Sequence, residues 1–309
     1  MNRRFFQLYP ALAEIVCVFQ EKRGQLRGKR FNQNRVNSYV RPPKLFMLFL
    51  LNLQHERCII TMYFYGQVMN LDDKIAKLKE MIAESENIVF FGGAGVSTES
   101  GIADFRSVDG LYNQKYDYPP EEILSHSFFM SKPYDYYRFH HDKLLVGDAK
   151  PNAAHLRLAQ LEEAGKLKAI ITQNIDGLHQ AAGSKNVIEL HGSLHRAYCS
   201  KCLKSHPAEI MTDKELDVPR CDCGGVIRPD IVFYEEALKQ EDIYAAINYI
   251  RHADMLIIGG TSLVVYPAAG LINYYRGDKL VLINRDRTSH DEYADLVIRD
   301  KIGEVFSQI

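Results

Sequence analysis

Short hydrophobic runs recur along residues 71–309, separated by segments long enough to form helices. They do not alternate with polar residues, which is typical of strands buried on both faces of a parallel sheet. The runs are Ile88–Phe91, Ala169–Thr172, Val187–Leu190, Met255–Ile258, Leu280–Ile283 and Leu296–Ile298. Before the first run, Ile75, Leu78 and Ile82 recur at helical spacing within Leu71 to about Glu86. The pattern predicts an α/β fold with a doubly wound parallel sheet.

Polar and glycine-rich tails follow these runs: GGAGVS, QNID, HGS, GGTS, NRD and RDKI. Ligands bind at the carboxyl ends of strands in open α/β sheets, so we expect the tails to line one crevice. The stretch Phe90–Ser107 predicts a strand, a turn through Gly92, Gly93 and Gly95, and the first turn of a helix. The N–H groups of such a turn favour a diphosphate. The stretch lacks G-x-G-x-x-G, however, and a plain structural turn explains it equally well when it is taken alone.

Two segments interrupt the alternation of runs and helices. Residues 111–150 are rich in Tyr and Phe and look helical after Pro133, so we expect a lid or side module whose aromatic side chains serve packing. Residues 195–228 contain four clustered cysteines and little hydrophobic mass. Burial alone therefore cannot fold this second insert.

Residues 1–68 lack a helical or strand period and differ in charge from the rest. Residues 1–70 contain 11 Lys/Arg and 3 Asp/Glu, whereas residues 71–309 contain 27 and 36. Three interpretations are possible: an organelle transit peptide, a segment that contacts a membrane or a partner, or a segment outside the folded protein. We favour the last, with translation starting at Met69, because Asn70 suits the N-cap of the first helix. The expected folded domain is residues 69–309.

The overall composition is that of a soluble globular protein, with 46% hydrophobic and 25% charged residues. The net charge of −1 gives no overall field that favours nucleic acid or a membrane surface. The longest apolar run, LFMLFLLNL at residues 45–53, is about half of the roughly 18 residues that a membrane span needs. We therefore expect no nucleic-acid partner and no membrane association.

The clustered cysteines form two close pairs, Cys199-x-x-Cys202 and Cys221-x-Cys223. Two such turns can close one tetrahedral structural zinc site, which would supply folding free energy to the insert. No secretory signal opens the chain, so a metal in a reducing compartment is favoured over disulfides. A redox pair and a zinc-ribbon nucleic-acid module are the alternatives, and the second lacks a basic stripe with stacked aromatics.

Taken together, the motifs resemble those of one family. GAGVSTESGIADFRS, TQNIDGLHQAAGS, ELHGS, the four cysteines, RPDIVFYEE and GTSLVVYPAAGL occur in this order, and residues 71–309 resemble the sirtuins, NAD-dependent protein deacylases. The sequence resembles bacterial cytoplasmic members most. The resemblance implies a Rossmann-like domain with a smaller zinc-binding and helical module. It also implies that the protein is cytoplasmic. It implies a protein-lysine deacetylase that consumes NAD as co-substrate, transfers the acetyl group to ADP-ribose and releases nicotinamide, with acetylated proteins as partners.

The resemblance also implies roles for individual residues. His191 matches the general base, supported by Asn174, and a neutral imidazole with an ordinary pKa of about 6.5 suits that role. The positions that match the NAD site are Gly93, Ala94, Gly95, Thr98, Phe105, Arg106, Gln173, Ile175, Asp176, His191, Gly260, Thr261, Ser262, Asn284, Arg285 and Ile302. The positions that match the peptide site, where a substrate adds as a β-strand between two loops, are Val232, Phe233, Tyr234 and Val264.

Several positions depart from the family pattern. The second cysteine pair is C-x-C instead of C-x-x-C, Ala103 replaces a proline, and Tyr234 replaces a glycine beside Glu235. Where desuccinylating members carry Tyr and Arg three residues apart, this chain has Asp135 and Arg138, so acetyl is the expected group. The alternatives are a mono-ADP-ribosyltransferase on the same NAD site, which the histidine base disfavours, and a non-catalytic NAD or ADP-ribose sensor.

Overall fold

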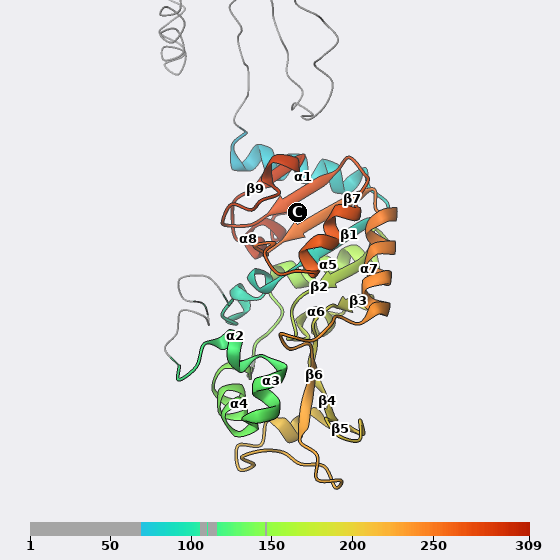
Figure 1. The fold of residues 1–309 in the computed structure, drawn as a ribbon. Coiled ribbons are helices and arrows are strands. Elements are labelled where there is room, and N and C mark those ends of the chain that lie inside the picture. The colour runs from blue at the N-terminus through green and yellow to red at the C-terminus, as the bar shows by residue number, and fades with distance from the viewer. Residues whose placement is uncertain (1–68, 106–109, 111–115, 146) are drawn as a thin grey trace, which may run out of the picture. The chain divides into compact units, whose positions relative to one another are not determined.

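The structure, a computed structural model, describes residues 69–105, 110, 116–145 and 147–309. The predicted N-terminal extension, residues 1–68, lies outside these described residues. Within them the chain forms a six-stranded parallel sheet and a three-stranded antiparallel sheet, with helices packed against both (Figure 1).

The parallel sheet confirms the predicted fold class and all six predicted strands. Its order is β3-β2-β1-β7-β8-β9, and all neighbours are parallel. The direction in which strands are added reverses between β1 and β7, which makes the ends of these strands the position where ligands bind in open α/β sheets. The strands are β1 Ile88–Gly92, β2 Leu167–Thr172, β3 Val187–Glu189, β7 Met255–Gly259, β8 Leu280–Ile283 and β9 Leu296–Ile298.

Helices cover both faces of this sheet, so its central strands are hydrophobic without alternation. Ile88 and Phe90 of β1 belong to one buried cluster, which also includes side chains of α1, α5 and α8. Val89 and Phe91 belong to a second cluster, on the face covered by α7 and the 3₁₀ helix η7. The covering elements are α1 Leu71–Ala83, α5 Ala153–Glu163, α8 Ile302–Phe306, α7 Gln240–His252 and η7 Ala268–Tyr274.

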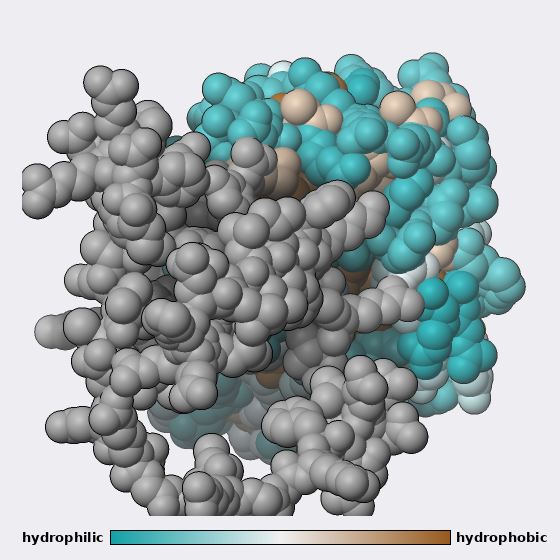
Figure 2. Space-filling model, turned by 90° about the horizontal axis from the view of Figure 1, so that it is seen from above, coloured by the Kyte–Doolittle hydropathy of each residue, from teal (hydrophilic) through white to brown (hydrophobic). Residues whose placement is uncertain are grey.

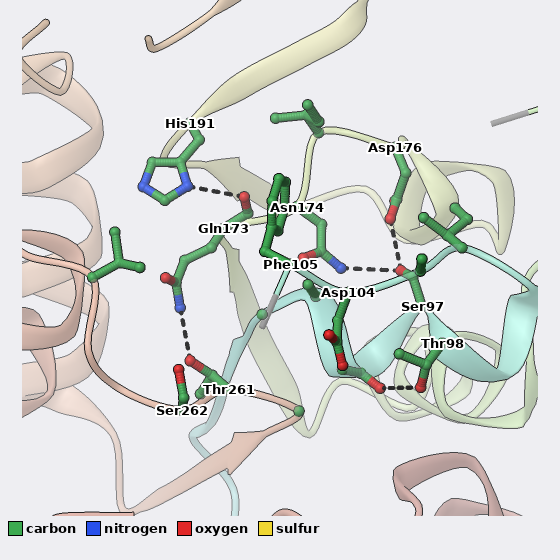
Figure 3. Close-up of a pocket in the computed structure, with 18 of the residues that line it drawn as sticks. Ser97, Thr98, Asp104, Phe105, Gln173, Asn174, Asp176, His191, Thr261 and Ser262 are labelled. Carbon is green, nitrogen blue, oxygen red and sulfur yellow. Dashed lines mark hydrogen bonds between the residues drawn. The ribbon is translucent and has the colours of Figure 1, made fainter. Parts of the chain in front are cut away.

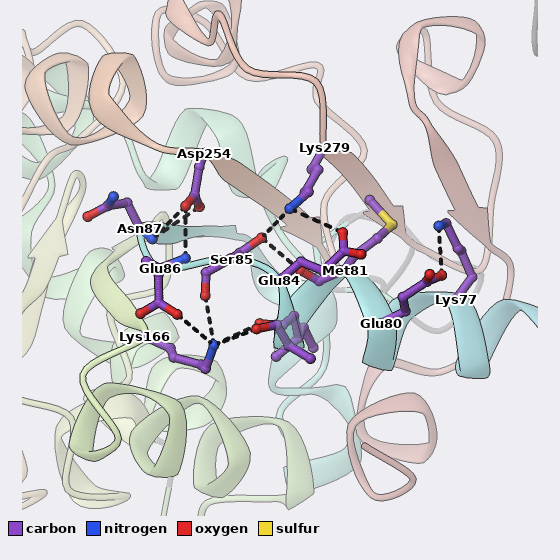
Figure 4. Close-up of polar contacts among 12 residues, drawn as sticks. Lys77, Glu80, Met81, Glu84, Ser85, Glu86, Asn87, Lys166, Asp254 and Lys279 are labelled. Carbon is purple, nitrogen blue, oxygen red and sulfur yellow. Dashed lines mark hydrogen bonds and ion pairs between the residues drawn. The ribbon is translucent and has the colours of Figure 1, made fainter.

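Polar side chains fix both ends of α1. The Asn70 side chain accepts a hydrogen bond from Asp73 N at 2.8 Å, which confirms the predicted N-cap. At the other end, Lys166 Nζ donates to the carbonyls of Ala83 and Ser85, both at 2.9 Å (Figure 4). A cation at the C-terminus of a helix satisfies unpaired carbonyls and opposes the negative end of the helix dipole. The end of α1 is thereby tied to the start of β2.

A second hydrophobic core joins the aromatic segment to the antiparallel sheet, and we call these elements together the small module. Phe129, Tyr136 and Tyr137 are fully buried and share a cluster with Ile227 and Phe233, so the aromatic side chains do serve packing. The elements of the small module are α2 Pro120–Ile123, α3 His126–Ser131, α4 Pro133–Phe139, the π turn η5 His140–Leu144, β4 Gly192–Cys199, β5 Ser205–His206, η6 Ala208–Met211 and β6 Ile227–Ile231. The sequence pattern did not predict β4, β5 and β6.

The surface agrees with the composition. Figure 2 shows the visible surface of the described residues coloured mostly as hydrophilic, with hydrophobic residues scattered between. Among the described residues, no helix is both long and apolar enough to cross a membrane.

Candidate active site

The glycine turn after β1 leads into two 3₁₀ turns, η2 Ala94–Val96 and η3 Thr98–Ser100. The expected first turn of a helix is thus present as 3₁₀ helix and does not continue into an α-helix. The Thr98 hydroxyl donates to the Gly95 carbonyl at 3.0 Å, and Gly101, with φ +86°, ends the turn in the left-handed region. A local side-chain hydrogen bond competes with the helical pattern, and a left-handed glycine terminates it.

The tails of β1 and β7 pack against each other through glycines. Gly95 N donates to Gly260 O at 2.8 Å, and Gly260 itself has φ +58°. A Cβ atom on Gly95 would lie 2.8 Å from Gly260 O, and one on Gly93 would lie 2.9 Å from Thr261 Cβ. Neither glycine of the first tail accepts a side chain without movement of the second tail, so the close approach of the two tails requires glycine here.

The strand tails line a cavity of about 680 Å³. Of the residues assigned to catalysis, NAD or peptide, all line this cavity except Arg106, which lies outside the described residues, and Val264, which is 56% exposed. Val265 and Tyr266, which were not assigned, line it instead. The cavity also reaches the end of the small module at Leu144. The roles of the individual residues stay predictions, but the structure brings these residues to one place.

His191 lies between β3 and β4, and its ring is held by the tail of β2. Nδ1 lies 3.0 Å from the carbonyl oxygen of Gln173 (Figure 3). Because a carbonyl only accepts, Nδ1 carries the proton, and the neutral ring has its lone pair on Nε2. Burial lowers the pKa of His191 below its ordinary 6.5, although the Gln173 hydrogen bond acts in the opposite direction. The ring is therefore a neutral base at pH 7.

A buried hydrogen-bond network joins the tails of β1 and β2. Asn174 Nδ2 donates to Ser97 Oγ at 3.0 Å, and Ser97 Oγ donates to Asp176 Oδ2 at 2.6 Å (Figure 3). Asp176 Oδ1 accepts from Leu178 N at 3.0 Å, at the start of α6 Leu178–Ala181. The Asn174 amide thus contacts Ser97, while the His191 ring rests on the backbone of the neighbouring Gln173. Ser97 lies within the motif GAGVSTESGIADFRS, but the family resemblance implied no role for its hydroxyl group.

Two further contacts span the cavity between distant strand tails. Gln173 Nε2 donates to Thr261 Oγ1 at 3.2 Å, which connects the tail of β2 to that of β7. Asp104 and Arg285 form an ion pair at 3.9 Å, which connects the loop after η3 to the tail of β8. The family resemblance implied no role for Asp104. Its partner Arg285 lies far along the chain, and hydrophobic periodicity does not indicate such a pair.

The four clustered cysteines form a candidate metal centre in the small module. The ligand atoms of Cys199, Cys202, Cys221 and Cys223 all lie within 4.8 Å of one another. The Cys199–Cys223 and Cys202–Cys221 Sγ distances are 3.5 and 3.7 Å, close to the edge of a tetrahedron with metal–sulfur bonds of about 2.3 Å. Four thiolates with no open position suit structural zinc, so the C-x-C spacing keeps the expected ligand count. A Cβ on Gly225 would lie 2.5 Å from Cys199 Sγ, so the turn also requires this glycine.

The loop after β6 contains a residue with a left-handed backbone. Glu235, the neighbour of Tyr234, has φ +76°. Such a φ is uncommon for a residue other than glycine. The expected replacement of a family glycine at Tyr234 stays a prediction.

Comparisons with known proteins agree with this site. A family model described as the Sir2 family matches residues 93–267. The NAD-dependent protein deacetylase of Clostridium acetobutylicum is 58% identical over 244 residues, which cover 78% of this chain and 100% of that protein. That of Clostridium perfringens is 58% identical over 243 residues, covering 77% and 99%.

Solved structures give the same result. A structure described as Sir2 with a p53 peptide and NAD+ is 42% identical, with a TM-score of 0.69 and coverage of 76% of this chain and 96% of that chain. A structure described as Sir2 bound to acetylated peptide is 41% identical, with the same TM-score and coverage.

Proposed function

The chain belongs to the Sir2 family, and we propose that its cavity catalyses the NAD-dependent removal of acetyl groups from protein lysines. The observation that carries this proposal is the position of His191, held as a neutral base by the Gln173 carbonyl in the cavity that the strand tails line. The relatives named NAD-dependent protein deacetylase match this chain over nearly their full length.

The residues of the cavity fit NAD as the co-substrate. The glycines of the β1 and β7 tails let the two tails pack closely together, so that Ala94 and Thr261 line the same cavity. Ala94, Thr98 and Phe105 would hold NAD on the β1 side, and Ser262, Asn284 and Ile302 on the β7 to α8 side, all of them lining the cavity. When bound, NAD would supply the anomeric ribose carbon that the acetyl oxygen of the modified lysine attacks, with nicotinamide as the leaving group.

His191 would act as the general base. Its Nε2 takes the proton of a ribose hydroxyl, while Nδ1 keeps its hydrogen bond to Gln173. Proton uptake at Nε2 is favoured because the resulting cation still donates from Nδ1 to a carbonyl oxygen. The network of Ser97, Asn174 and Asp176 orients the β2 tail that carries this carbonyl.

The substrate peptide would bind at the loop after β6. Among the described residues, no hydrogen bond involves the backbone N–H or C=O of Glu235 or Ala237, and both residues are exposed. Free backbone groups on residues two apart are the pattern that an added β-strand pairs with. We infer acetylated proteins as partners, with no nucleic acid or membrane, and a reducing compartment, the cytoplasm, which suits the four thiols.

The proposal is tested by incubating the protein with labelled NAD and an acetylated peptide. Replacement of His191 with Ala should lower deacetylation by about 10²- to 10⁴-fold while NAD binding is kept. His252→Gln, a change to an exposed histidine on α7, is the matched control and should leave activity unchanged. For the unaltered protein, kcat/KM should fall only at pH values below about 6.5, because the base must be neutral and burial lowers its pKa.

Two results would overturn the proposal. One is transfer of label to an acceptor protein without loss of acetyl groups, which identifies an ADP-ribosyltransferase. The other is NAD binding without any turnover in the presence of peptide, which identifies a sensor.

A further inference from the structure

The loop that follows β6 contains an unusual combination of backbone and side chain. Glu235 is one of three non-glycine residues with positive φ among the described residues. A left-handed backbone costs free energy for a residue with a Cβ atom, so it persists only where other contacts hold it. Glu235 lies in the segment that we propose as the peptide edge, so these contacts bear on substrate binding.

The contacts that hold Glu235 come from the helical part of the small module. Its carboxylate accepts from Ser127 N and from Ser127 Oγ, both at 2.9 Å. Ser127 lies in the first turn of α3, where backbone N–H groups have no helical partner. Both carboxylate oxygens of Glu235 are thus used to bind one residue of α3.

The backbone of the same loop forms a short parallel bridge with the residues at the start of α3. Tyr234 N donates to Leu124 O at 2.9 Å, and His126 N donates to Tyr234 O at 3.0 Å. The start of α3 and the loop after β6 therefore lie side by side. The bridge uses the backbone groups of Tyr234, while those of Glu235 and Ala237 have no intramolecular partner among the described residues.

The next residue, Glu236, anchors the loop from the interior. Its carboxylate accepts from Arg228 Nη1 and Nη2 at 2.5 and 2.9 Å and from Phe233 N at 2.9 Å. Arg228 is 4% exposed and lies over the ring of Phe233, with 4.3 Å between Cζ and the ring centroid. Glu236 also lies 2.7 Å from His126 Nδ1 of α3, so it fixes the base of the loop, and Glu235 adds the contacts to Ser127 at the outer edge.

We propose that Glu235 is a positioning residue that fastens the peptide-binding edge of the loop to α3. With the carboxylate in place, the unpaired backbone groups of Glu235 and Ala237 are held in one position before the peptide arrives. Pre-organisation of this kind lowers the entropy cost of binding and leaves the chemical step unchanged. The inference rests on the proposed deacetylase function, because it assigns the edge to the acetylated peptide.

The test compares Glu235→Gly with the unaltered protein. Glycine removes the backbone strain and the clamp together, so we expect an unchanged or higher Tm and a KM for peptide raised about five- to tenfold. The kcat value and the KM for NAD should change less than about twofold. Glu235→Gln keeps one accepting oxygen, so its KM for peptide should lie between the values of Glu235→Gly and of the unaltered protein. Glu241→Gln removes an exposed charge from α7, six residues away, and should change nothing.

A second variant tests the partner of the contact. Ser127→Ala removes one of the two hydrogen bonds and should raise the peptide KM by a smaller factor, with no further effect when it is added to Glu235→Gly. An unchanged peptide KM in Glu235→Gly, or equal losses in kcat and in NAD affinity, would overturn the inference. Binding of a fluorescent acetylated peptide, measured by anisotropy for both proteins, tests the clamp separately. If the unaltered protein shows no NAD turnover, the proposed function fails, while equal anisotropy Kd values for the two proteins mean that the clamp fails.

Discussion

The parallel sheet and the small module are stabilised in different ways. The sheet is buried on both faces by two hydrophobic clusters, and its central strands have fully buried side chains such as Phe90 and Ile257. The small module has one aromatic cluster, a buried Arg228 that pairs with Glu236, and four cysteines that converge on one point. Its cysteine turns contain few hydrophobic residues, so a metal must supply what hydrophobic burial does not.

The difference matters because the site draws on both parts. The tails of the parallel strands supply the glycine turns and the carbonyl that holds His191. The loop 232–237, which follows β6 of the small module, supplies the proposed peptide edge. Loss of the small module should therefore abolish binding of the peptide and leave binding of NAD. Damage to the tails of the parallel strands should do the reverse.

The largest expected effect comes from removing the metal ligands. Structural zinc contributes about 10–16 kcal/mol of apparent binding free energy in zinc-finger peptides, comparable to the stability of a whole domain. Cys221→Ser should abolish zinc binding and unfold β4 and β6, while β1 and β7 stay folded. Amide hydrogen exchange and zinc content measure this. Re-addition of zinc to chelated, unaltered protein should restore protection in β4 and β6, and equal loss of protection in both sheets would contradict the comparison.

A smaller effect is expected on acidification, because both parts contain buried histidines. Burial lowers the pKa of His155 to about 4 and of His179 to about 3 beside the parallel sheet, and of His140 to about 4 in the small module. The unfolded chain takes up protons near pH 6.5 and the folded chain does not. Stability should therefore be constant above about pH 7 and fall below 6.5, by at most about 1.4 kcal/mol per pH unit for each ring.

Urea unfolding at several pH values checks this slope. His179→Leu should make stability depend less steeply on pH, because the unfolded variant has one histidine fewer to take up a proton. His252→Gln, a change to an exposed histidine, is the control. A slope that is the same in all three proteins would show that these buried rings do not govern acid stability.

The smallest effect is expected at the polar connection between α1 and β2. Lys166→Met removes the hydrogen bonds to the carbonyls at the end of α1 and should lower the free energy of unfolding by about 1–2 kcal/mol. Lys168→Met, which loses a single bond to the Gly165 carbonyl, is the matched control and should cost less. Urea unfolding at neutral pH measures both. Equal losses would mean that the bonds at the helix end contribute nothing of their own.

The sequence pattern predicts the parallel sheet well because each of its strands is a continuous hydrophobic run. It misses β4 because this strand mixes buried and exposed side chains and ends at the metal ligand Cys199. It misses β6 because the polar residues Arg228 and Asp230 interrupt its hydrophobic run, although Arg228 is buried. The family motifs locate the cavity residues, including His191. They do not indicate the Ser97–Asp176 hydrogen bond, which joins positions 79 residues apart, or the left-handed backbone of Glu235. Such features depend on tertiary contacts that no local pattern records.

The parallel sheet has another property that bears on the behaviour of the protein at high concentration. Its outermost strands, β3 and β9, have only three residues each. Short edge strands offer few unpaired backbone groups to a strand of another molecule, which limits edge-to-edge aggregation. Self-association through this sheet therefore requires that an inner strand such as β1 or β7 is first exposed, so aggregation of the protein should follow its unfolding and not precede it.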